Sequence, residues 1–301
     1  MRAVMIHETG DLDVLHLEEV ERPEPGDGEV LIRVHAASVN PADWKARRGM
    51  MPKRLPAVLG SDVSGTVEAS RAEGFSEGDE VFGFAASGGY AEFAATPAGL
   101  IAKKPAGVSH EQAAAIPVAG LTAWQALFDR AGVERGQSAL IAGAAGGVGH
   151  LAVQFARIAQ ARTIGIGSPR NRDFVLGLGA DEFVDYTQQN IAEAVTGVDF
   201  AFDTVGGEIT EALLATVRQG GILITIAAAP PEAAAAERGA RAELLIMSPN
   251  PAQLARIAEL VASGDVHVEI SNTFPLEEVA KAHELSESGH TRGKIILTVS
   301  P

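Results

Sequence analysis

Cysteine is absent from this chain of 301 residues. Its absence excludes disulfide bonds, thiolate metal sites and a cysteine nucleophile. Cations are scarce as well, with 24 Lys and Arg against 39 Asp and Glu, which gives a net charge of −15. Nucleic acids and anionic membrane surfaces are bound by clustered cations, so this balance predicts no nucleic-acid partner.

Long apolar runs are also missing. No segment approaches the roughly 20 apolar residues that span a bilayer, and the opening sequence, MRAVMIHE, has too short an apolar stretch for a secretory leader. We therefore expect no membrane span and a cytoplasmic location. Apolar residues make up 46% of the chain and glycine accounts for 33 residues, which indicates a folded protein with many tight turns.

The first hundred residues read as β-structure. Buried or alternating apolar patterns predict strands near 30–36, 63–69, 78–83 and 90–94, with glycine between them. This spacing is typical of a compact β-rich barrel or sandwich.

The pattern changes near residue 109, where Ser109 and Gln112 form a capping-box signature ahead of a helical stretch that ends at Gly132. From there strands and helices alternate, which predicts βαβ units and a doubly wound parallel sheet. The expected strands are 138–142, 162–166, 182–185, 198–203 and 221–227, and the expected helices are 147–160, 171–178, 189–195, 207–217 and 249–263. The last of these helices is predicted to have Ser248 as N-cap and Pro249 as its first residue. A helix at 276–288 and a strand at 294–299 follow, and the pattern does not decide which sheet this strand joins.

The most informative segment is SALIAGAAGGVGHLAVQFA, residues 138–156. A buried strand enters a glycine turn (residues 143–149), which leads into an amphipathic helix. Positions 144, 146 and 149 match G-x-G-x-x-G with alanine at the first place. Gly146 would let the backbone approach a pyrophosphate and Gly149 would let helix and strand pack closely, while the helix N-terminus offers free N–H groups to the anion. A purely structural turn is the alternative.

The end of the following strand discriminates between nicotinamide cofactors. An NAD site usually has an acidic residue about 20 positions past the motif, but this chain has GSPRNR at 167–172. Arg170 and Arg172, with a nearby hydroxyl and amide, suit a 2′-phosphate, so NADPH is favoured. The alternative is that both arginines are solvated residues of a helix's first turn. The ends of the strands before Val205 and Ala227 should face the same crevice.

At this point the chain resembles the medium-chain dehydrogenase/reductase superfamily, in its zinc-independent, zeta-crystallin-like quinone oxidoreductase branch. The resemblance covers nearly the whole chain and rests on ordered landmarks: SVNPADWK (38–45), LGSDVSG (59–65), GGYAE (88–92), AGLTAW (119–124), the glycine turn, GADEFVDY (179–186) and RGKIIL (292–297).

The resemblance implies a GroES-like catalytic domain (1–115), a Rossmann NADP-binding domain (116–265) and a C-terminal segment (266–301) whose strand returns to the catalytic domain. It also implies NADPH as cofactor and a homodimer. The cofactor residues that we expect from the turn, the strand ends and the resemblance are Thr122, Ala145, Gly146, Gly147, Val148, Ser168, Arg170, Asn171, Tyr186, Val205 and Ala227. Among these, Ser168, Arg170 and Asn171 would hold the 2′-phosphate, Tyr186 would lie near the cofactor phosphates and Thr122 near the nicotinamide.

No metal site is expected. The zinc-dependent branch needs a cysteine where this chain has Asn40-Pro41, and a His-Glu pair where it has Ser61-Asp62. The eight histidines show no ligand spacing.

Without zinc, another group must polarise the acceptor of the hydride. Asn40 is the first candidate, because its amide can donate to an enolate or quinol oxygen without titrating; a turn residue before Pro41 is the alternative. Trp44 could form the flat wall of a substrate pocket, Lys45 could donate a hydrogen bond and Asp43 could hold the loop, although a local turn network would explain all three. Arg47 and Arg48 are expected in a solvated loop; the alternative is an adaptable pocket rim that they form with Met50 and Met51.

The leading hypothesis is an NADPH-dependent reductase of a quinone or an α,β-unsaturated carbonyl compound. An enoyl-thioester reductase is a second possibility, although the acidic chain gives little sign of a basic groove for its carrier. The third is an NADPH-binding regulatory protein with little turnover.

Overall fold

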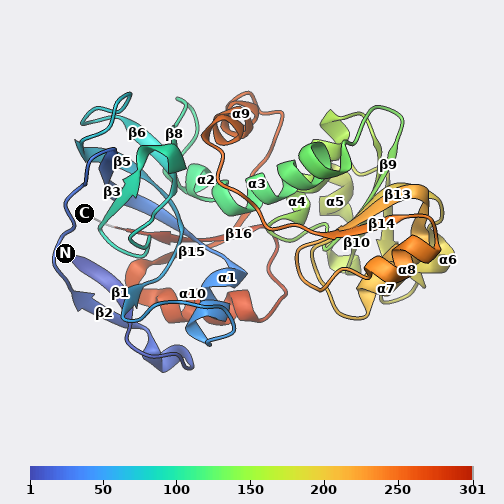
Figure 1. The fold of residues 1–301 in the computed structure, drawn as a ribbon, viewed down its shortest axis with the longest axis horizontal. Coiled ribbons are helices and arrows are strands. Elements are labelled where there is room, and N and C mark those ends of the chain that lie inside the picture. The colour runs from blue at the N-terminus through green and yellow to red at the C-terminus, as the bar shows by residue number, and fades with distance from the viewer. Residues whose placement is uncertain (300–301) are drawn as a thin grey trace. The chain divides into compact units, whose positions relative to one another are not determined.

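The computed structural model describes residues 1–299. The chain packs as two compact units, one made of Met1–Leu121 with the segment that begins at Pro249, and the other of Thr122–Ser248 (Figure 1). The expected α/β architecture is confirmed, because one unit is β-rich and the other is built on a parallel sheet. Both predicted domain limits, 115/116 and 265/266, fall inside the first unit, and the domain assignment itself stays a prediction.

The first unit contains a seven-stranded sheet in the order β15-β16-β3-β5-β6-β8, with β7 also paired to β3, and a three-stranded sheet, β2-β1-β4. Its strands are β1 (Arg2–Ile6), β2 (His16–Glu19), β3 (Glu29–Val39), β4 (Ala57–Val58), β5 (Asp62–Ser70), β6 (Glu80–Phe84), β7 (Phe93–Pro97), β8 (Ile101–Lys103), β15 (Ile270–Pro275) and β16 (Lys294–Thr298). Its helices are α1 (Pro41–Arg47), α2 (His110–Ala114), α9 (Pro251–Ala262) and α10 (Val279–Glu287); α3 (Pro117–Trp124) crosses into the second unit.

The last strand of the chain is part of the first unit's sheet. β16 pairs antiparallel with β3, in a register that sets Ile295 opposite Val39. The apolar side chains of both strands enter one core, which includes Val34, Ala37 and Leu297. This register brings Lys294, at the start of β16, beside Asn40, just after β3.

The second unit is a six-stranded sheet in the order β11-β10-β9-β12-β13-β14, with every neighbouring pair parallel. Its strands are β9 (Ser138–Ala142), β10 (Arg162–Gly167), β11 (Glu182–Asp185), β12 (Val198–Asp203), β13 (Val217–Thr225) and β14 (Arg241–Leu244). Its helices are α4 (Gly149–Ile158), α5 (Arg172–Gly177), α6 (Ile191–Ala194), α7 (Ile209–Thr216) and α8 (Glu232–Glu237), preceded by a π-helix at Gln125–Ala131. Strand order reverses at β9, the strand that leads into the glycine turn, and ligands bind at such a point in open α/β sheets.

Two local predictions are wrong. The final helix of the sheet region begins at Pro251 with Asn250 as its N-cap, not at Pro249 after Ser248. The Asn250 side chain accepts from the Gln253 N–H, whereas the backbone of Ser248 is held by the side chain of Gln125. The strand predicted at 90–94 begins only at Phe93, because the backbone of Tyr90 bonds to Leu59 and Val4 instead.

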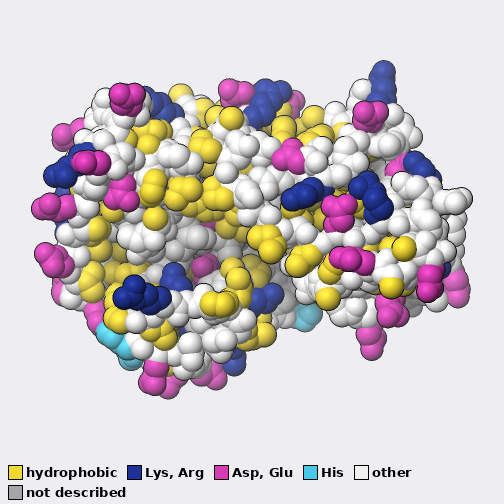
Figure 2. Space-filling model, viewed as in Figure 1, with side chains coloured by type: hydrophobic (Ala, Val, Ile, Leu, Met, Phe, Trp, Pro, Cys, Tyr) yellow, Lys and Arg dark blue, Asp and Glu magenta, His cyan; other side chains and the backbone are white. Residues whose placement is uncertain are grey.

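The surface agrees with the charge balance. On the face of residues 1–299 that Figure 2 shows, Lys and Arg side chains lie among Asp and Glu and form no continuous basic stripe. No helix within these residues is long and apolar enough to cross a membrane.

Candidate active site

The glycine turn has the conformation that its sequence predicts. Gly143 has a φ of +65°, in the region that favours glycine. A Cβ on Gly149 would lie 2.1 Å from the carbonyl oxygen of Gly143, so only glycine lets α4 begin directly against the turn. The side chain of Thr204, which follows β12, donates to the carbonyl of Ala142 at 2.8 Å and fixes the turn from the neighbouring strand.

Several amides of this turn have no backbone partner. Within residues 1–299, the N–H groups of Ala145, Gly147 and Val148 donate to no backbone carbonyl, and residues 146–148 are partly exposed. They adjoin the N-terminus of α4, where helix geometry leaves further N–H groups unpaired and the helix dipole favours an anion. The turn therefore fits a diphosphate group.

The end of β10 carries polar groups and no acid. Ser168 and the residues of the short 3₁₀ turn Pro169–Asn171 follow the strand directly, and the Asn171 amide donates to the Ser168 hydroxyl at 3.3 Å. Arg170 is exposed on this turn. This set of a hydroxyl, an amide and a guanidinium suits a phosphate rather than a ribose hydroxyl.

The other predicted cofactor residues follow the remaining strands of the same sheet, with one exception. Tyr186 comes after β11 and is 51% exposed, and Val205 comes after β12 and is 54% exposed. Ala227 follows β13. A Cβ on Gly206 would lie 2.9 Å from the carbonyl oxygen of Ala227, so the loops after β12 and β13 touch. Thr122 is the exception, because it lies buried within α3.

Asp203 is a residue that sequence reasoning missed. It ends β12 and is fully buried. Its carboxylate accepts from the amides of Val205 and Gly206 at 2.9 and 2.8 Å, and from the hydroxyls of Thr210 and Thr225 at 2.6 and 3.3 Å. One carboxylate thus shapes the loop after β12 and ties it to the end of β13. The only sequence signal was an acid followed by Thr-Val-Gly-Gly at a strand end.

A second group of polar residues lies buried within the first unit, around Asn40. The side-chain amide nitrogen of Asn40 donates to Asp62 at 3.0 Å, and its oxygen accepts from the ammonium of Lys294 at 2.5 Å. Asp62 also accepts from the backbone N–H of Val118 at 3.1 Å. Asn40, Asp62 and Lys294 are each at most 3% exposed, so this group is held by its own hydrogen bonds.

Asp43 lies next to this group, and its carboxylate accepts hydrogen bonds from two other groups of the protein. Its carboxylate accepts from the backbone N–H of Asn40 at 2.8 Å, which caps α1, and from the hydroxyl of Tyr90, also at 2.8 Å. The ring of Tyr90 packs where Gly60 has no side chain. Asp43 therefore fixes the start of α1, and with it the backbone of Asn40.

Burial dominates the protonation of these groups. Burial raises the pKa of Asp43 to about 6. It also raises the pKa of Asp62, and the positive charge of Lys294 partly offsets this rise. Burial lowers the pKa of Lys294 and raises that of Tyr90 well above its usual value. Strongly shifted pKa values in one cluster are typical of functional sites, although structural networks produce them too.

The other two predicted catalytic residues lie on α1 and are half-buried. The Lys45 ammonium lies 5.6 Å from the centre of the Trp44 ring. The indole N–H of Trp44 is buried and has no hydrogen-bond partner within residues 1–299. Buried polar groups usually have a partner, which makes the Trp44 indole a candidate donor to a bound molecule.

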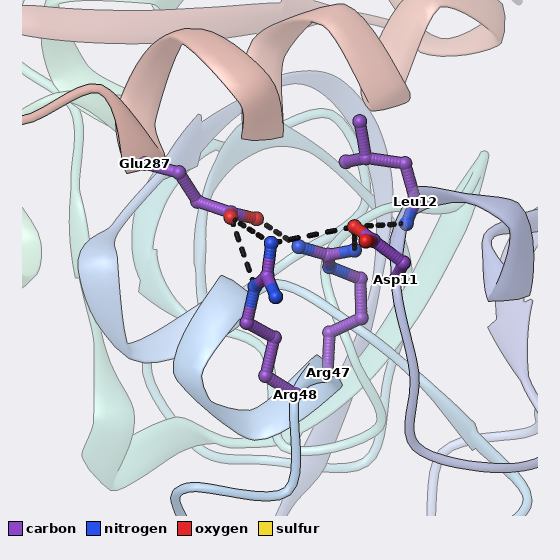
Figure 3. A network of polar contacts seen from close by, with 5 residues as sticks. All are labelled: Asp11, Leu12, Arg47, Arg48 and Glu287. Carbon is purple, nitrogen blue, oxygen red and sulfur yellow. Dashed lines mark hydrogen bonds and ion pairs between the residues drawn. The ribbon is translucent and has the colours of Figure 1, made fainter.

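The opposite end of α1 is anchored by a charged network (Figure 3). Arg47 is fully buried, not in a solvated loop as the sequence suggested, and it donates to Glu287 on α10. Arg48 donates to the same carboxylate at 2.9 Å and to Asp11 at 3.3 Å. Because the cluster around Asn40 holds the other end, α1 is fixed at both ends.

No group of three or more His, Asp or Glu side chains within residues 1–299 could hold a metal ion. The groups around Asp62 bond to one another.

Comparison with known proteins agrees with this architecture. Residues 26–106 match the alcohol dehydrogenase GroES-like domain family, and residues 178–297 match a family described as zinc-binding dehydrogenase. Human quinone oxidoreductase is 35% identical, over 99% of this chain and 97% of that protein. A 2-methylene-furan-3-one reductase from Solanum lycopersicum is 32% identical, over 100% of this chain and 80% of that protein. The structure of Escherichia coli quinone oxidoreductase complexed with NADPH superposes with a TM-score of 0.91 at 26% identity, over 99% of this chain and 100% of the other.

The chain therefore belongs to the medium-chain dehydrogenase/reductase superfamily, in its zeta-crystallin-like quinone oxidoreductase branch, and it is an oxidoreductase. The expected combination of a GroES-like β-rich part and a Rossmann-type sheet is confirmed.

Proposed function

We propose that this protein oxidises NADPH and delivers the hydride to a quinone or to the β-carbon of an α,β-unsaturated carbonyl compound. The observation that carries the proposal is the glycine turn with its unpaired amides, followed at the next strand by Ser168, Arg170 and Asn171 in place of an acid. The relatives support it, since one was solved with NADPH and the others are named a quinone oxidoreductase and a 2-methylene-furan-3-one reductase.

The nucleotide would be held by the second unit. The amides of Ala145, Gly147 and Val148 would bind the diphosphate, and Gly146, whose own N–H donates to the Gly143 carbonyl at 2.8 Å, would let the backbone approach it. Ser168, Arg170 and Asn171 would bind the 2′-phosphate. Tyr186, Val205, Ala227 and Thr122 would complete the contacts. When bound, NADPH supplies a hydride from C4 of its nicotinamide ring.

The first unit would stabilise the acceptor. Both acceptor classes develop negative charge on an oxygen as the hydride arrives, and the second N–H of the Asn40 amide would donate to that oxygen. Trp44 would provide a flat wall with a free indole N–H, and Lys45 a further donor. Asp43 would act by fixing α1, because both of its donors come from the protein itself. The proton that completes the product would come from solvent.

The test is NADPH oxidation against a small panel: a simple quinone, an alkenone, and an enoyl thioester on a phosphopantetheine carrier. Turnover with either of the first two supports the proposal. Preference for the carrier-linked substrate would instead identify an enoyl-thioester reductase, and tight NADPH binding without turnover would identify a regulatory protein.

We also propose a homodimer that forms through the second unit's sheet. β14 ends the strand order, so one of its edges has no strand partner within residues 1–299. Leu244 and the nearby Ile246 are 47% and 77% exposed. Sedimentation velocity should show a dimer that Ile246→Asp converts to a monomer, and a monomeric wild type would refute this. The cytoplasmic location stays a prediction.

A further inference from the structure

Lys294 is a buried charge that the proposed chemistry does not use. It is 3% exposed, and its ammonium donates to the Asn40 side-chain oxygen and, at 3.5 Å, to the backbone carbonyl of Val39. Burying an ammonium is strongly unfavourable unless its surroundings compensate for the lost water. A well-packed apolar set in place of Lys294, Asn40 and Asp62 together would often stabilise a fold as well or better, so the retained charge calls for another explanation.

The chemistry of the two partners fixes how the Asn40 amide is turned. An ammonium can only donate hydrogen bonds, so the atom of Asn40 that faces Lys294 must be its oxygen. An ionised carboxylate can only accept, so the atom that faces Asp62 must be the nitrogen. With one partner of each kind, rotating the amide by half a turn would set donor against donor and acceptor against acceptor.

We propose that Lys294 is a positioning residue that holds the amide nitrogen of Asn40 in the orientation needed to donate its second N–H to the substrate oxygen. This inference rests on the proposed role of Asn40. One N–H of that nitrogen is occupied by Asp62, which leaves the other to bind substrate. The same contacts explain why the RGK landmark lies 254 residues away from Asn40 in the sequence yet beside it in the sheet.

The matched variants are Lys294→Met, which keeps the length of the side chain but removes the donor, and Lys281→Met, which removes an exposed lysine on α10 of the same unit. We expect Lys294→Met to lower kcat about 10-fold to 100-fold, since misplacement of a catalytic group costs up to that range, with little change in the Kd for NADPH. Lys281→Met should leave kcat as it is. If Lys294→Met folds poorly, Lys294→Gln tests the same idea, because a glutamine amide can face Asn40 with either end; it should lower kcat as well.

The decisive measurement is the combination with Asn40→Ala. If Lys294 acts through Asn40, then Lys294→Met should add no further loss of kcat in the Asn40→Ala background. An equal loss in both backgrounds, or a wild-type kcat in Lys294→Met, would overturn the proposal. A wild-type kcat in Asn40→Ala would overturn it as well, while leaving NADPH-dependent reduction intact.

A second measurement does not depend on turnover, so it tests whether Lys294 orients the Asn40 amide even if the proposed function fails. In ¹⁵N-resolved NMR spectra, the side-chain NH₂ of Asn40 should give one dispersed pair of signals in the wild type. That pair should broaden or shift toward free-amide positions in Lys294→Met but not in Lys281→Met. Unchanged signals in Lys294→Met would show that the amide needs no help from Lys294.

Discussion

The buried imidazole of His283 predicts how the free energy of unfolding depends on pH, and the size of the effect follows from its lowered pKa. The ring is fully buried on α10, neither nitrogen has a hydrogen-bond partner within residues 1–299, and Tyr90 packs edge-on against it at 5.9 Å. Burial, with a smaller effect of the Arg47 charge, lowers its pKa from 6.5 to about 3. The folded protein therefore keeps His283 neutral at a pH where the unfolded chain would protonate it.

The sign and size follow from proton linkage. Between the two pKa values the unfolded state binds one proton more, so stability falls as pH falls, by about 1.4 kcal/mol per pH unit. From about pH 7.5 to about pH 4.5 the protonation of His283 in the unfolded chain costs the fold about 3 kcal/mol. Asp43 acts in the opposite sense. Because its pKa is raised from 3.8 to about 6, the folded state binds the extra proton between these two pH values. Lowering the pH over the same range therefore stabilises the fold by about 2 kcal/mol through Asp43.

The perturbation is His283→Leu, measured by urea unfolding at both pH values. Any change in packing is the same at each pH, so it cancels in the difference between them. The variant should gain about 3 kcal/mol relative to wild type on going to the lower pH. Asp43→Asn should lose about 2 kcal/mol on the same comparison. A wild-type pH slope in His283→Leu would refute the conclusion that burial holds this imidazole neutral.

The remaining predictions concern the cofactor and the reaction. Arg170→Ala should weaken NADPH binding about 10-fold to 100-fold, the value of a charged hydrogen bond, and leave NADH nearly unaffected; equal losses in calorimetry would remove the 2′-phosphate role. Asn40→Ala should lower kcat about 100-fold with NADPH affinity retained, which steady-state kinetics and a fluorescence titration can separate. Asp203→Ala should raise the Kd for NADPH about tenfold because the loop after β12 loses its acceptor, and Asp203→Asn should recover part of the loss; an unchanged Kd would contradict the shaping role. Gly149→Val should abolish NADPH binding because the first Cβ would meet the Gly143 carbonyl, and retained affinity would contradict the close-packed turn.

The elements that the sequence predicted best are those whose cause is local. β9, the glycine turn and α4 are specified by a short apolar run, by glycines at positions that admit no Cβ and by helical periodicity. The same holds for the Ser109 cap, whose two hydrogen bonds with Gln112 are both present. Where two local signals competed, at Ser248-Pro249 and Asn250-Pro251, the choice depended on Gln125, which lies 123 positions earlier and bonds to Ser248.

The buried cluster could not be predicted from the sequence either, because it too depends on contacts between residues that lie far apart in the chain. Asn40, Asp62, Tyr90 and Lys294 come from four separate segments, and nothing in any one segment shows that the four side chains meet. Only the pairing of both β16 and β5 with β3 places a donor-only ammonium and an acceptor-only carboxylate on opposite ends of one amide. Periodicity reports which face of a strand is buried, but it carries no information about which distant charge that face meets. The orientation of Asn40, and so its capacity to donate, is a property of the tertiary fold.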